Sequence, residues 1–415
     1  MMVRNQIIVV GGYGTVGQQI SRRLVQYIAE DTSGLLPSYD VIVAGRNTAA
    51  AEAFSQSTNG QIQPLQWDIQ SSPDTWPDLS AARLLIMCLD LTDTTLVKYC
   101  LNHGIHYMDI TANGEYLQQI QQLKIATQIP LSQAMGDHTS LYATTPSTHT
   151  ANSITATATA TNIPTSSASP MSTALISIGL APGLTNLLAA AVHQEMDHTD
   201  QLDISIMLGL GERHGEAAIR WTVEQLGSSF TIMSDGQPMT VSSLTDGRVV
   251  AMPYEQSSGR QYVYRFPFSD QQTLAQTLHV PTVSTRLGFD SVLLTRLLAG
   301  VQKLGVFRLL RFAPVQQAMI SLFGSIHAGS DRYAIRIDAK GSKDGKPVQR
   351  YCVLHGHNQS HATAEVTALA AMMLLELQDH LPGGVQHIEQ VLEWKTFAAR
   401  LQRHLPFEMM GLDHY

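Results

Sequence analysis

Cysteine is scarce in this chain. Its 415 residues include three cysteines, Cys88, Cys100 and Cys352, and none of them lies near another at the spacing of a metal site or a redox motif. Neither a disulfide framework nor a zinc site is therefore indicated. We expect each cysteine to pack as a small apolar side chain, and a reducing cytoplasm is the simplest expected location.

Long apolar runs and basic clusters are missing as well. No stretch approaches the roughly 20 apolar residues that cross a bilayer, and the apolar run near the N-terminus is too short for a signal peptide. The net charge is −8, and there is no run of Lys or Arg. We therefore expect neither a nucleic acid nor a membrane as a partner. The hydrophobic fraction of 44% permits a large core, and the length favours two or three domains.

A glycine-rich turn separates the first predicted strand from the first predicted helix, over residues 6–10 and 16–30. Gly12 permits a tight turn, Gly14 lets a pyrophosphate approach the backbone, and Gly17 lets the helix pack against the strand. The strand–turn–helix context makes this pattern a prediction of a dinucleotide site. The expected cofactor contacts are Gly12, Tyr13, Gly14, Thr15, Val16, Gly17, Arg46, Cys88 and Leu89.

The second predicted strand, at 41–45, lacks a carboxylate at its end. NAD-selective sites usually place Asp or Glu there, to bind the ribose 2′-hydroxyl. This chain has Arg46 followed by Asn47. Because an arginine can hold a 2′-phosphate and stack on adenine, the sequence favours NADP(H) over NAD(H). The alternative is that Arg46 is a solvated surface residue.

Predicted strands and helices alternate through the N-terminal third, which indicates a parallel sheet with helices on both faces. The expected fold is α/β: an N-terminal Rossmann doubly wound parallel sheet plus a second α+β domain with a mixed, mostly antiparallel sheet. A hairpin around Asp344 and Gly345 belongs to the second sheet. The expected limits are 1–138 for the Rossmann domain, 139–173 for a flexible Ser/Thr/Ala-rich insertion, 174–360 for the substrate domain and 361–415 for C-terminal helices that pack back on the Rossmann domain.

Two predicted strand ends supply candidates for the cleft. The fourth strand ends at Cys88 and Leu89, which border the nicotinamide ribose in sheets of this kind. On the fifth strand, Tyr107 and Asp109 share a face because side chains alternate along a strand. Tyr107 could contact substrate and Asp109 could orient its amine. Capping of the turn at 111–114 is an equally good account of Asp109.

Several stretches resemble the saccharopine dehydrogenase-like NAD(P)-dependent oxidoreductases. They are GGYGTVG at 11–17 with AGR at 44–46, GIHYMDITANGEY at 104–116, GLAPGLTNLLA at 179–189 and GERHGEAAIRWTVEQL at 211–226. TRLGFDS at 285–291 and ATAEVTALAA at 362–371 fit the same family. The resemblance implies a middle α/β domain that completes the active site, and hydride transfer at a C–N bond of a small amino-acid- or polyamine-like substrate.

The resembling stretches contain further candidates. Asn186 opens a helix and could face the nicotinamide or a substrate carboxylate, or it could serve domain packing. Arg213 could clamp a carboxylate, and His214 is either the acid or a surface histidine. Arg286 is a weaker substrate candidate that could instead pair with Asp290.

No metal site is expected, because the histidines His355, His357 and His361 have no cysteine or carboxylate at ligand spacing. Two other functions remain open: an NADPH-dependent reductase of a C=O or C=C bond, and a protein that binds or senses the dinucleotide without turnover. The insertion at 139–173 leaves substrate access open. A homodimer is also open, since the apolar helix at 361–378 could form an interface or belong to the core.

Overall fold

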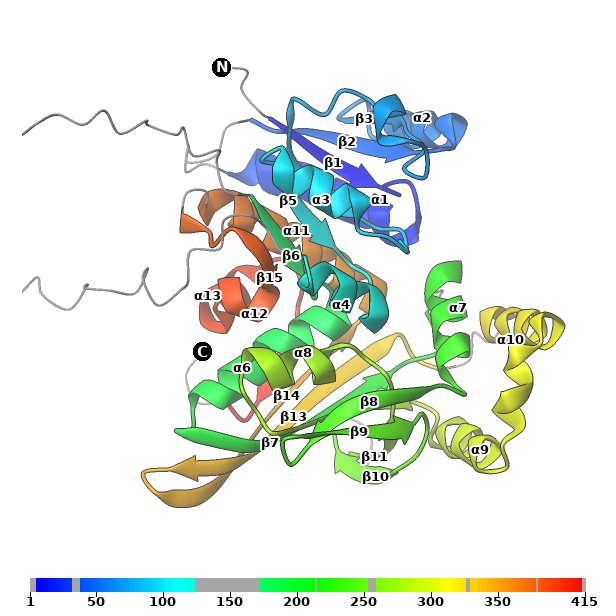
Figure 1. Cartoon of the computed structure of the whole chain (residues 1–415), viewed down its shortest axis with the longest axis vertical. Helices are drawn as coiled ribbons and strands as arrows, with labels where there is room; N and C mark the ends of the chain where they lie inside the picture. The colour runs from blue at the N-terminus through cyan, green and yellow to red at the C-terminus, as the bar shows by residue number, and fades with distance from the viewer. Residues whose placement is uncertain are drawn as a thin grey trace, which may run out of the picture.

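The computed structural model describes residues 5–31, 38–123, 172–212, 215–252, 259–325, 329–377 and 380–412. These residues form two sheets with helices packed around them (Figure 1). Helices α6 (Thr185–Gln194) and α11 (Gln359–Leu377) lie between the sheets. Among the described residues, no helix is long and apolar enough to cross a membrane.

The first sheet has seven strands in the order β15-β6-β5-β4-β1-β2-β3, and every neighbouring pair is parallel. Its strands are β1 (Gln6–Val10), β2 (Asp40–Gly45), β3 (Ile62–Gln66), β4 (Ala82–Met87), β5 (His106–Asp109), β6 (Thr173–Ile176) and β15 (Gly384–His387). The central strands are apolar and buried on both faces, as a parallel sheet between two helix layers requires. The predicted Rossmann sheet is confirmed.

Helices cover both faces of the first sheet. They are α1 (Thr15–Glu30), α2 (Thr48–Ser57), α3 (Thr95–Asn102), α4 (Gly114–Gln121) and α11. α11 packs on α1, and Glu365 in its buried middle forms an ion pair with Arg23 of α1. The short helix η1 (Pro73–Thr75) lies between β3 and β4.

The second sheet has the order β10-β11-β12-β7-β13-β14-β16, with β8 beside β12 and β9 beside β8. β12 and β7 are parallel, and the other pairs are antiparallel, which confirms the predicted mixed sheet. Its strands are β7 (His198–Leu208), β8 (Ser229–Ser234), β9 (Gln237–Ser242), β10 (Arg248–Ala251), β11 (Arg260–Arg265), β12 (Thr282–Phe289), β13 (Arg332–Lys343), β14 (Lys346–His357) and β16 (Glu408–Met410). The β13–β14 hairpin turns at Asp344 and Gly345, both with positive φ.

The remaining helices belong mostly to the second sheet. They are η2 (Leu180–Leu184), α6, α7 (Glu216–Gln225), α8 (Asp270–Thr277), α9 (Val292–Lys303), η3 (Val306–Arg311), α10 (Ala313–Ser325), α12 (Ile388–Val391) and α13 (Trp394–Leu401).

The chain crosses between the sheets more often than the predicted domain limits imply. β6 begins at Thr173, beside the limit expected at 174, yet it pairs with β5 in the first sheet. The C-terminal segment adds a strand to each sheet, because β15 pairs with β6 and β16 pairs with β14. Most of the predicted insertion at 139–173 lies outside the described residues.

Candidate functional site

The glycine turn after β1 has the tight geometry that its sequence predicts. Gly11 has a φ of +76°, and a Cβ atom on Gly12 would lie 2.6 Å from Cγ1 of Val43. A Cβ on Gly17 would clash with the backbone of Gly11 and Gly12. α1 then starts at Thr15 with no side-chain cap and no acidic residue in its first turn. Its positive end is therefore suited to a phosphate.

Tyr13 joins this turn to the end of β2. Its hydroxyl accepts a hydrogen bond from the backbone N–H of Asn47 at 3.0 Å, and its ring lies against Gly45. Asn47 in turn caps α2, accepting from the N–H of Ala50 at 3.1 Å. Arg46 is exposed between them, and no hydrogen bond or ion pair of its guanidinium is found within the described part of the chain. It is thus positioned beside the turn with its charge available.

The end of β4 lies over the same turn. The backbone N–H of Cys88 donates to the carbonyl of Val10 at 3.0 Å, and the Leu89 side chain covers Gly11. Leu89 is nevertheless 42% exposed. Burial raises the pKa of the Cys88 thiol, so this cysteine stays protonated. The predicted cofactor residues of the turn, β2 and β4 thus come together in one place.

A pocket of about 130 Å³ lies between the two sheets, and we call it the interdomain pocket. Its lining residues are Ile110, Ile178, Gly179, Leu180, Ala181, Pro182, Ile206, Leu208, Phe268, Gln359 and Thr363. Residues after β5 and β6 form one wall, β7 forms another, and the start of α11 supplies the two polar side chains, Gln359 and Thr363. None of the described residues that line it carries a charged side chain. Ligands of open α/β sheets bind in this kind of crevice, outside the carboxyl ends of the strands.

The wall that follows β6 is shaped by glycines. Gly179 and Gly183 have φ values of +132° and +130°, and the Ala181–Pro182 peptide bond is cis. Asn186 is fully buried and supports this wall from behind. Its Oδ1 accepts from the N–H of Gly183 at 3.1 Å, and its Nδ2 donates to Glu389 at 3.1 Å. Asn186 is thus a positioning residue in this structure, in line with the packing alternative.

Asp109 caps a turn on the face of the first sheet that is covered by α3 and α4, opposite to the interdomain pocket. It is fully buried and accepts from the Tyr107 hydroxyl at 2.5 Å and from the N–H of Thr111 at 2.8 Å. Burial raises its pKa to about 7, although both hydrogen bonds lower it. Tyr107 packs in the core with α3 and α4, whereas Ile110 lines the interdomain pocket. The same-face prediction for Tyr107 and Asp109 is confirmed, but neither residue lines the pocket.

Arg286 lies in an ion-pair network on the far face of the second sheet. Its guanidinium contacts Asp203 at 2.8 Å and Asp246 at 2.5 Å, and its Nε donates to the carbonyl of Asp246. Arg286 is level with Ser205 of β7, whose neighbour Ile206 faces the interdomain pocket. Arg286 therefore points away from the pocket. It does not pair with Asp290.

Two residues that follow β7, Glu212 and Gly215, lie against the start of α11 and the start of α1. A Cβ on Gly215 would lie 3.6 Å from Oγ1 of Thr15, at the start of α1. Glu212 caps α11, because its carboxylate accepts from the N–H groups of Gln359 at 2.8 Å and Ser360 at 3.0 Å. The candidates Arg213 and His214 lie outside the described residues.

Sequence reasoning missed the two polar side chains that line the pocket, Gln359 and Thr363, and the residue that caps their helix, Glu212. Thr363 is part of the stretch ATAEVTALAA, and Gln359 shortly precedes it. Both stand at the start of a strongly apolar helix, where a polar residue with a lining role could have been suspected. Nothing local to the sequence shows which side of the helix faces the other sheet, or that Glu212 reaches its N-terminus.

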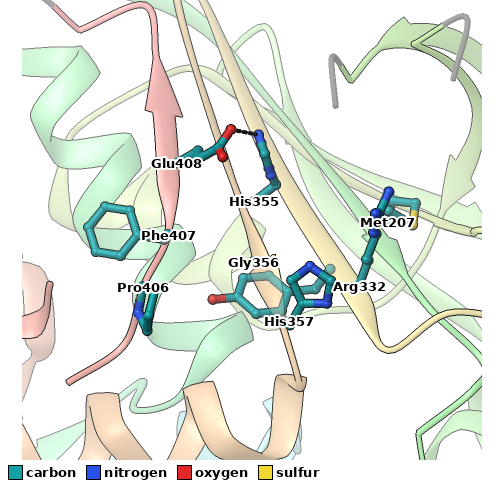
Figure 2. A pocket seen from close by; sticks show the side chains of 9 residues that line it. Met207, Arg332, His355, Gly356, His357, Pro406, Phe407 and Glu408 are labelled. Atoms are coloured by element: carbon teal, nitrogen blue, oxygen red, sulfur yellow. Dashed lines mark ion pairs between the residues drawn. The ribbon is translucent and has the colours of Figure 1, made fainter. Parts of the chain in front are cut away.

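A larger pocket, of about 210 Å³, lies at the edge of β14 (Figure 2). In it His355 faces Glu408 at 3.3 Å, and the lining residue His357 contacts Asp331 at 2.7 Å. Met207 lines this pocket while its neighbour Ile206 lines the interdomain pocket, so the two pockets open largely on opposite faces of the second sheet. Within the described ranges, no group of three or more His, Cys, Asp or Glu could hold a metal ion.

Comparison with known proteins gives a match for the N-terminal domain and a fold for the whole chain. Residues 7–163 match the model of the saccharopine dehydrogenase NADP binding domain. No curated protein matches the chain. The structure resembles apo saccharopine dehydrogenase (L-Glu forming) from Saccharomyces cerevisiae, with a TM-score of 0.60, 14% identity and coverage of 98% of this chain and 100% of that one.

A second solved structure, C. glutamicum DAP dehydrogenase in complex with DAP, is a weaker match. Its TM-score is 0.37 at 11% identity, over 96% of this chain and 99% of that one. The domain match and the fold of the yeast enzyme agree with the glycine turn and the parallel sheet. The N-terminal part of the chain is thus similar to the NADP binding domain of saccharopine dehydrogenase, and the chain as a whole shares the fold of the yeast enzyme.

Proposed function

We propose that this protein uses NADP(H) to transfer hydride to or from the C–N bond of an imine or secondary amine, with an amino-acid- or polyamine-like substrate. The observation that carries the proposal is the position of the interdomain pocket. It opens after the carboxyl ends of β5 and β6, while the uncapped start of α1 and the exposed end of β4 stand on the same side of the sheet. A dinucleotide laid across that edge would bring its nicotinamide toward the pocket.

The preference for NADP(H) over NAD(H) rests on Arg46. It is exposed at the end of β2 beside the start of α2, where the cofactor's adenosine ribose would lie. With no carboxylate at that strand end, the site offers a cation to a 2′-phosphate and no acceptor to a 2′-hydroxyl.

Hydride transfer itself is the cofactor's chemistry. The pocket would orient the substrate and keep water away from the reacting atoms. Its apolar walls would exclude water, and Thr363 and Gln359 are the groups that could orient a substrate nitrogen. A protonated imine accepts hydride most readily, so an acid is needed nearby. His214 as that acid and Arg213 as a carboxylate clamp remain predictions from the sequence, as do a cytoplasmic location and a homodimer.

The test is a coupled assay with NADPH and panels of α-keto acids and amines, followed by the absorbance of the reduced cofactor. We expect oxidation of NADPH that requires both partners. Oxidation with the carbonyl compound alone would favour a C=O reductase. NADPH binding without turnover across broad panels would favour a protein that only binds the dinucleotide.

Thr363→Val tests the location of the chemistry, because it keeps the shape of the side chain and removes its hydroxyl from the pocket. We expect kcat/KM to fall about 5-fold, the effect of one hydrogen bond of about 1 kcal/mol, with the Kd for NADPH unchanged. Thr396→Val on the exposed side of α13 is the matched control. Equal kcat/KM values for the two variants would show that the substrate does not contact Thr363 in this pocket.

A further inference from the structure

Large apolar side chains are exposed mainly on one part of the molecule. This part is the segment 292–325, made of α9, η3 and α10, and we call it the helical arm. Its exposed apolar residues are Leu293, Leu297, Leu304, Val306, Leu309, Phe312, Val315 and Leu322. Leu293 and Leu304 are each 81% exposed. Elsewhere in the described ranges such residues are scattered, which is ordinary for a folded surface.

The exposed residues fall on regular faces of their helices. Leu297 of α9 and Leu304, the C-cap of that helix, follow Leu293 by four and eleven residues, which places the three on one face of an α-helix. The opposite face of α9 is buried and packs on β11 and β12. On η3, Val306 and Leu309 stand three residues apart, which aligns them along a 3₁₀ helix. The arm thus uses one face for packing and leaves a second apolar face exposed.

The charge of the arm is of one sign. Residues 292–325 contain no Asp or Glu, whereas the whole chain has a net charge of −8. The basic residues are Arg296, Lys303, Arg308 and Arg311, all exposed. No ion pair of theirs is found in the described part of the chain; Arg296 lies over the Tyr262 ring at 5.1 Å and Arg311 over Phe312 at 4.8 Å. The apolar face is therefore flanked by uncompensated cations.

The shape of the molecule leaves this face open. Figure 1 shows α9 and α10 at one side of the molecule, α10 beside α7, with the C-terminal helices α12 and α13 at the opposite side. α10 packs on α7 and η3, and Gln316 on that inner side contacts Glu224 of α7 at 3.4 Å. The described structure places no other element over the outer face.

We propose that the helical arm attaches the protein to the surface of a bilayer that contains anionic lipids. Such a surface offers an apolar layer for the leucines and negative headgroups for the four cations. A second copy of the chain is a poorer occupant, because a two-fold contact would bring each cationic face against itself. The sequence-based expectation of no membrane partner rested on the lack of a spanning segment and of a run of Lys or Arg, and attachment to a bilayer surface needs neither.

The first test is flotation of the full chain with lipid vesicles in a density gradient. One set contains phosphatidylcholine alone, and the other contains about one part phosphatidylglycerol to three parts phosphatidylcholine. We expect the protein to float with the anionic vesicles at roughly 50 mM salt and to be released at roughly 500 mM, because salt screens the headgroup charge. Absence of binding to both vesicle types at low salt would overturn the proposal.

Paired variants separate the arm from the rest of the surface. Arg308→Glu with Arg311→Glu should lower partition onto anionic vesicles roughly 25-fold or more, at about 5-fold for each cation removed. Leu293→Ser with Leu304→Ser should lower it about 10-fold or more. The matched controls are Lys343→Glu with Lys346→Glu on the distant β13–β14 hairpin, and Val249→Ser on β10, all of which are exposed.

NADPH binding and the thermal midpoint of each variant report whether it is folded. If arm and control variants bind vesicles alike, the arm is not the attachment site. If sedimentation without vesicles instead shows a concentration-dependent dimer that the leucine variants abolish, the arm is a contact between copies and the proposal fails.

Discussion

Arg46, Tyr13 and Asn47 show how neighbouring residues divide structural and binding work. Tyr13 and Asn47 lock the end of β2 to the glycine turn and to α2, through bonds of 3.0 and 3.1 Å. Arg46 takes no part in that lock and stays exposed. Its removal should therefore cost little stability, so an effect on the cofactor can be measured cleanly.

Arg46→Ala is expected to weaken NADPH binding roughly 10-fold or more and NADH binding by less than about 2-fold. The reason is that a charge-assisted hydrogen bond to the 2′-phosphate contributes about 1.5–3 kcal/mol, and NADH lacks that phosphate. Titration of both cofactors by fluorescence gives the two dissociation constants. Arg403→Ala, an exposed arginine far from the turn, is the control. Equal weakening of both cofactors would leave the preference for NADP(H) unexplained.

Asp109 makes the stability of the protein depend on pH. Burial raises the pKa of Asp109 in the folded protein to about 7, above the value of about 4 in an unfolded chain. Between these values the folded state holds a proton that the unfolded state has lost. The carboxyl group therefore favours folding below about pH 4, and this contribution is lost as the pH rises to about 7.

Asp109→Asn should remove this dependence. Between about pH 5 and pH 8 the variant should gain roughly 2–3 kcal/mol of unfolding free energy relative to the wild type. Urea denaturation at both pH values measures the difference, and exposed Asp74→Asn serves as the control. A difference between variant and wild type that does not change with pH would mean that Asp109 is ionised across this range.

Arg286 illustrates what sequence reasoning cannot reach for single residues. An arginine in a resembling stretch was a reasonable substrate candidate, with Asp290 as its local alternative partner. Its real partners, Asp203 and Asp246, are brought to it by the pairing of β12 with β7 and by the loop before β10. Asp290 instead accepts hydrogen bonds from Ser330. Such pairings depend on strand register, which no local pattern specifies.

Among the elements, those with strong local patterns were predictable. The apolar strands β1, β2 and β4, helix α1 and the hairpin at Asp344–Gly345 all form where expected. β12 was missed because it buries polar side chains, Ser284, Thr285 and Arg286, so its apolar alternation is broken. β15 and β16 span only four and three residues, too few for a pattern to be read. The interdomain pocket could not be predicted because segments far apart in the sequence enclose it.

Two glycines in different helices should respond oppositely to the same substitution. Gly17→Ala puts a methyl group into the backbone of Gly11 and Gly12. We expect it to cost roughly 1–3 kcal/mol of unfolding free energy and to weaken NADPH binding, because the turn must open. Gly300, in the last turn of α9, faces open space. Gly300→Ala should stabilise the protein by roughly 0.5–1 kcal/mol, because alanine loses less backbone entropy in a helix.

Chemical denaturation and NADPH titration of both variants check this pair. Gly300→Ala should leave the Kd for NADPH unchanged, since α9 lies away from the glycine turn. An unchanged Kd for Gly17→Ala would show that the turn tolerates a Cβ and that the cofactor does not depend on its close packing.

In the whole molecule, the two sheets are tied together by one core. A single cluster of buried side chains runs from Ile7 and Val9 of β1 to Ile204 of β7 and Ile335 of β13. The chain also returns to the first sheet at β15 after it has built most of the second. His387 at the end of β15 anchors that return, because its ring contacts the Ser177 hydroxyl at 2.8 Å. The first sheet thus cannot be completed until the second has been traversed.

We therefore expect the two sheets to unfold together. Urea unfolding followed by far-ultraviolet circular dichroism and by tryptophan fluorescence should give the same midpoint. Trp221 reports on the second sheet, since it packs on Phe266 and Phe268. Trp67 reports on the first sheet, because it belongs to the cluster of buried side chains between that sheet and α3 and α4. Trp221→Phe removes the fluorescence signal of the second sheet, and the fluorescence midpoint of this variant should still coincide with its dichroism midpoint.

NADPH should raise all midpoints together, because a ligand of the folded state stabilises the whole cooperative unit. Separate transitions, with only the earlier or the later one shifted by NADPH, would show that the shared core and the returning strand do not couple the sheets.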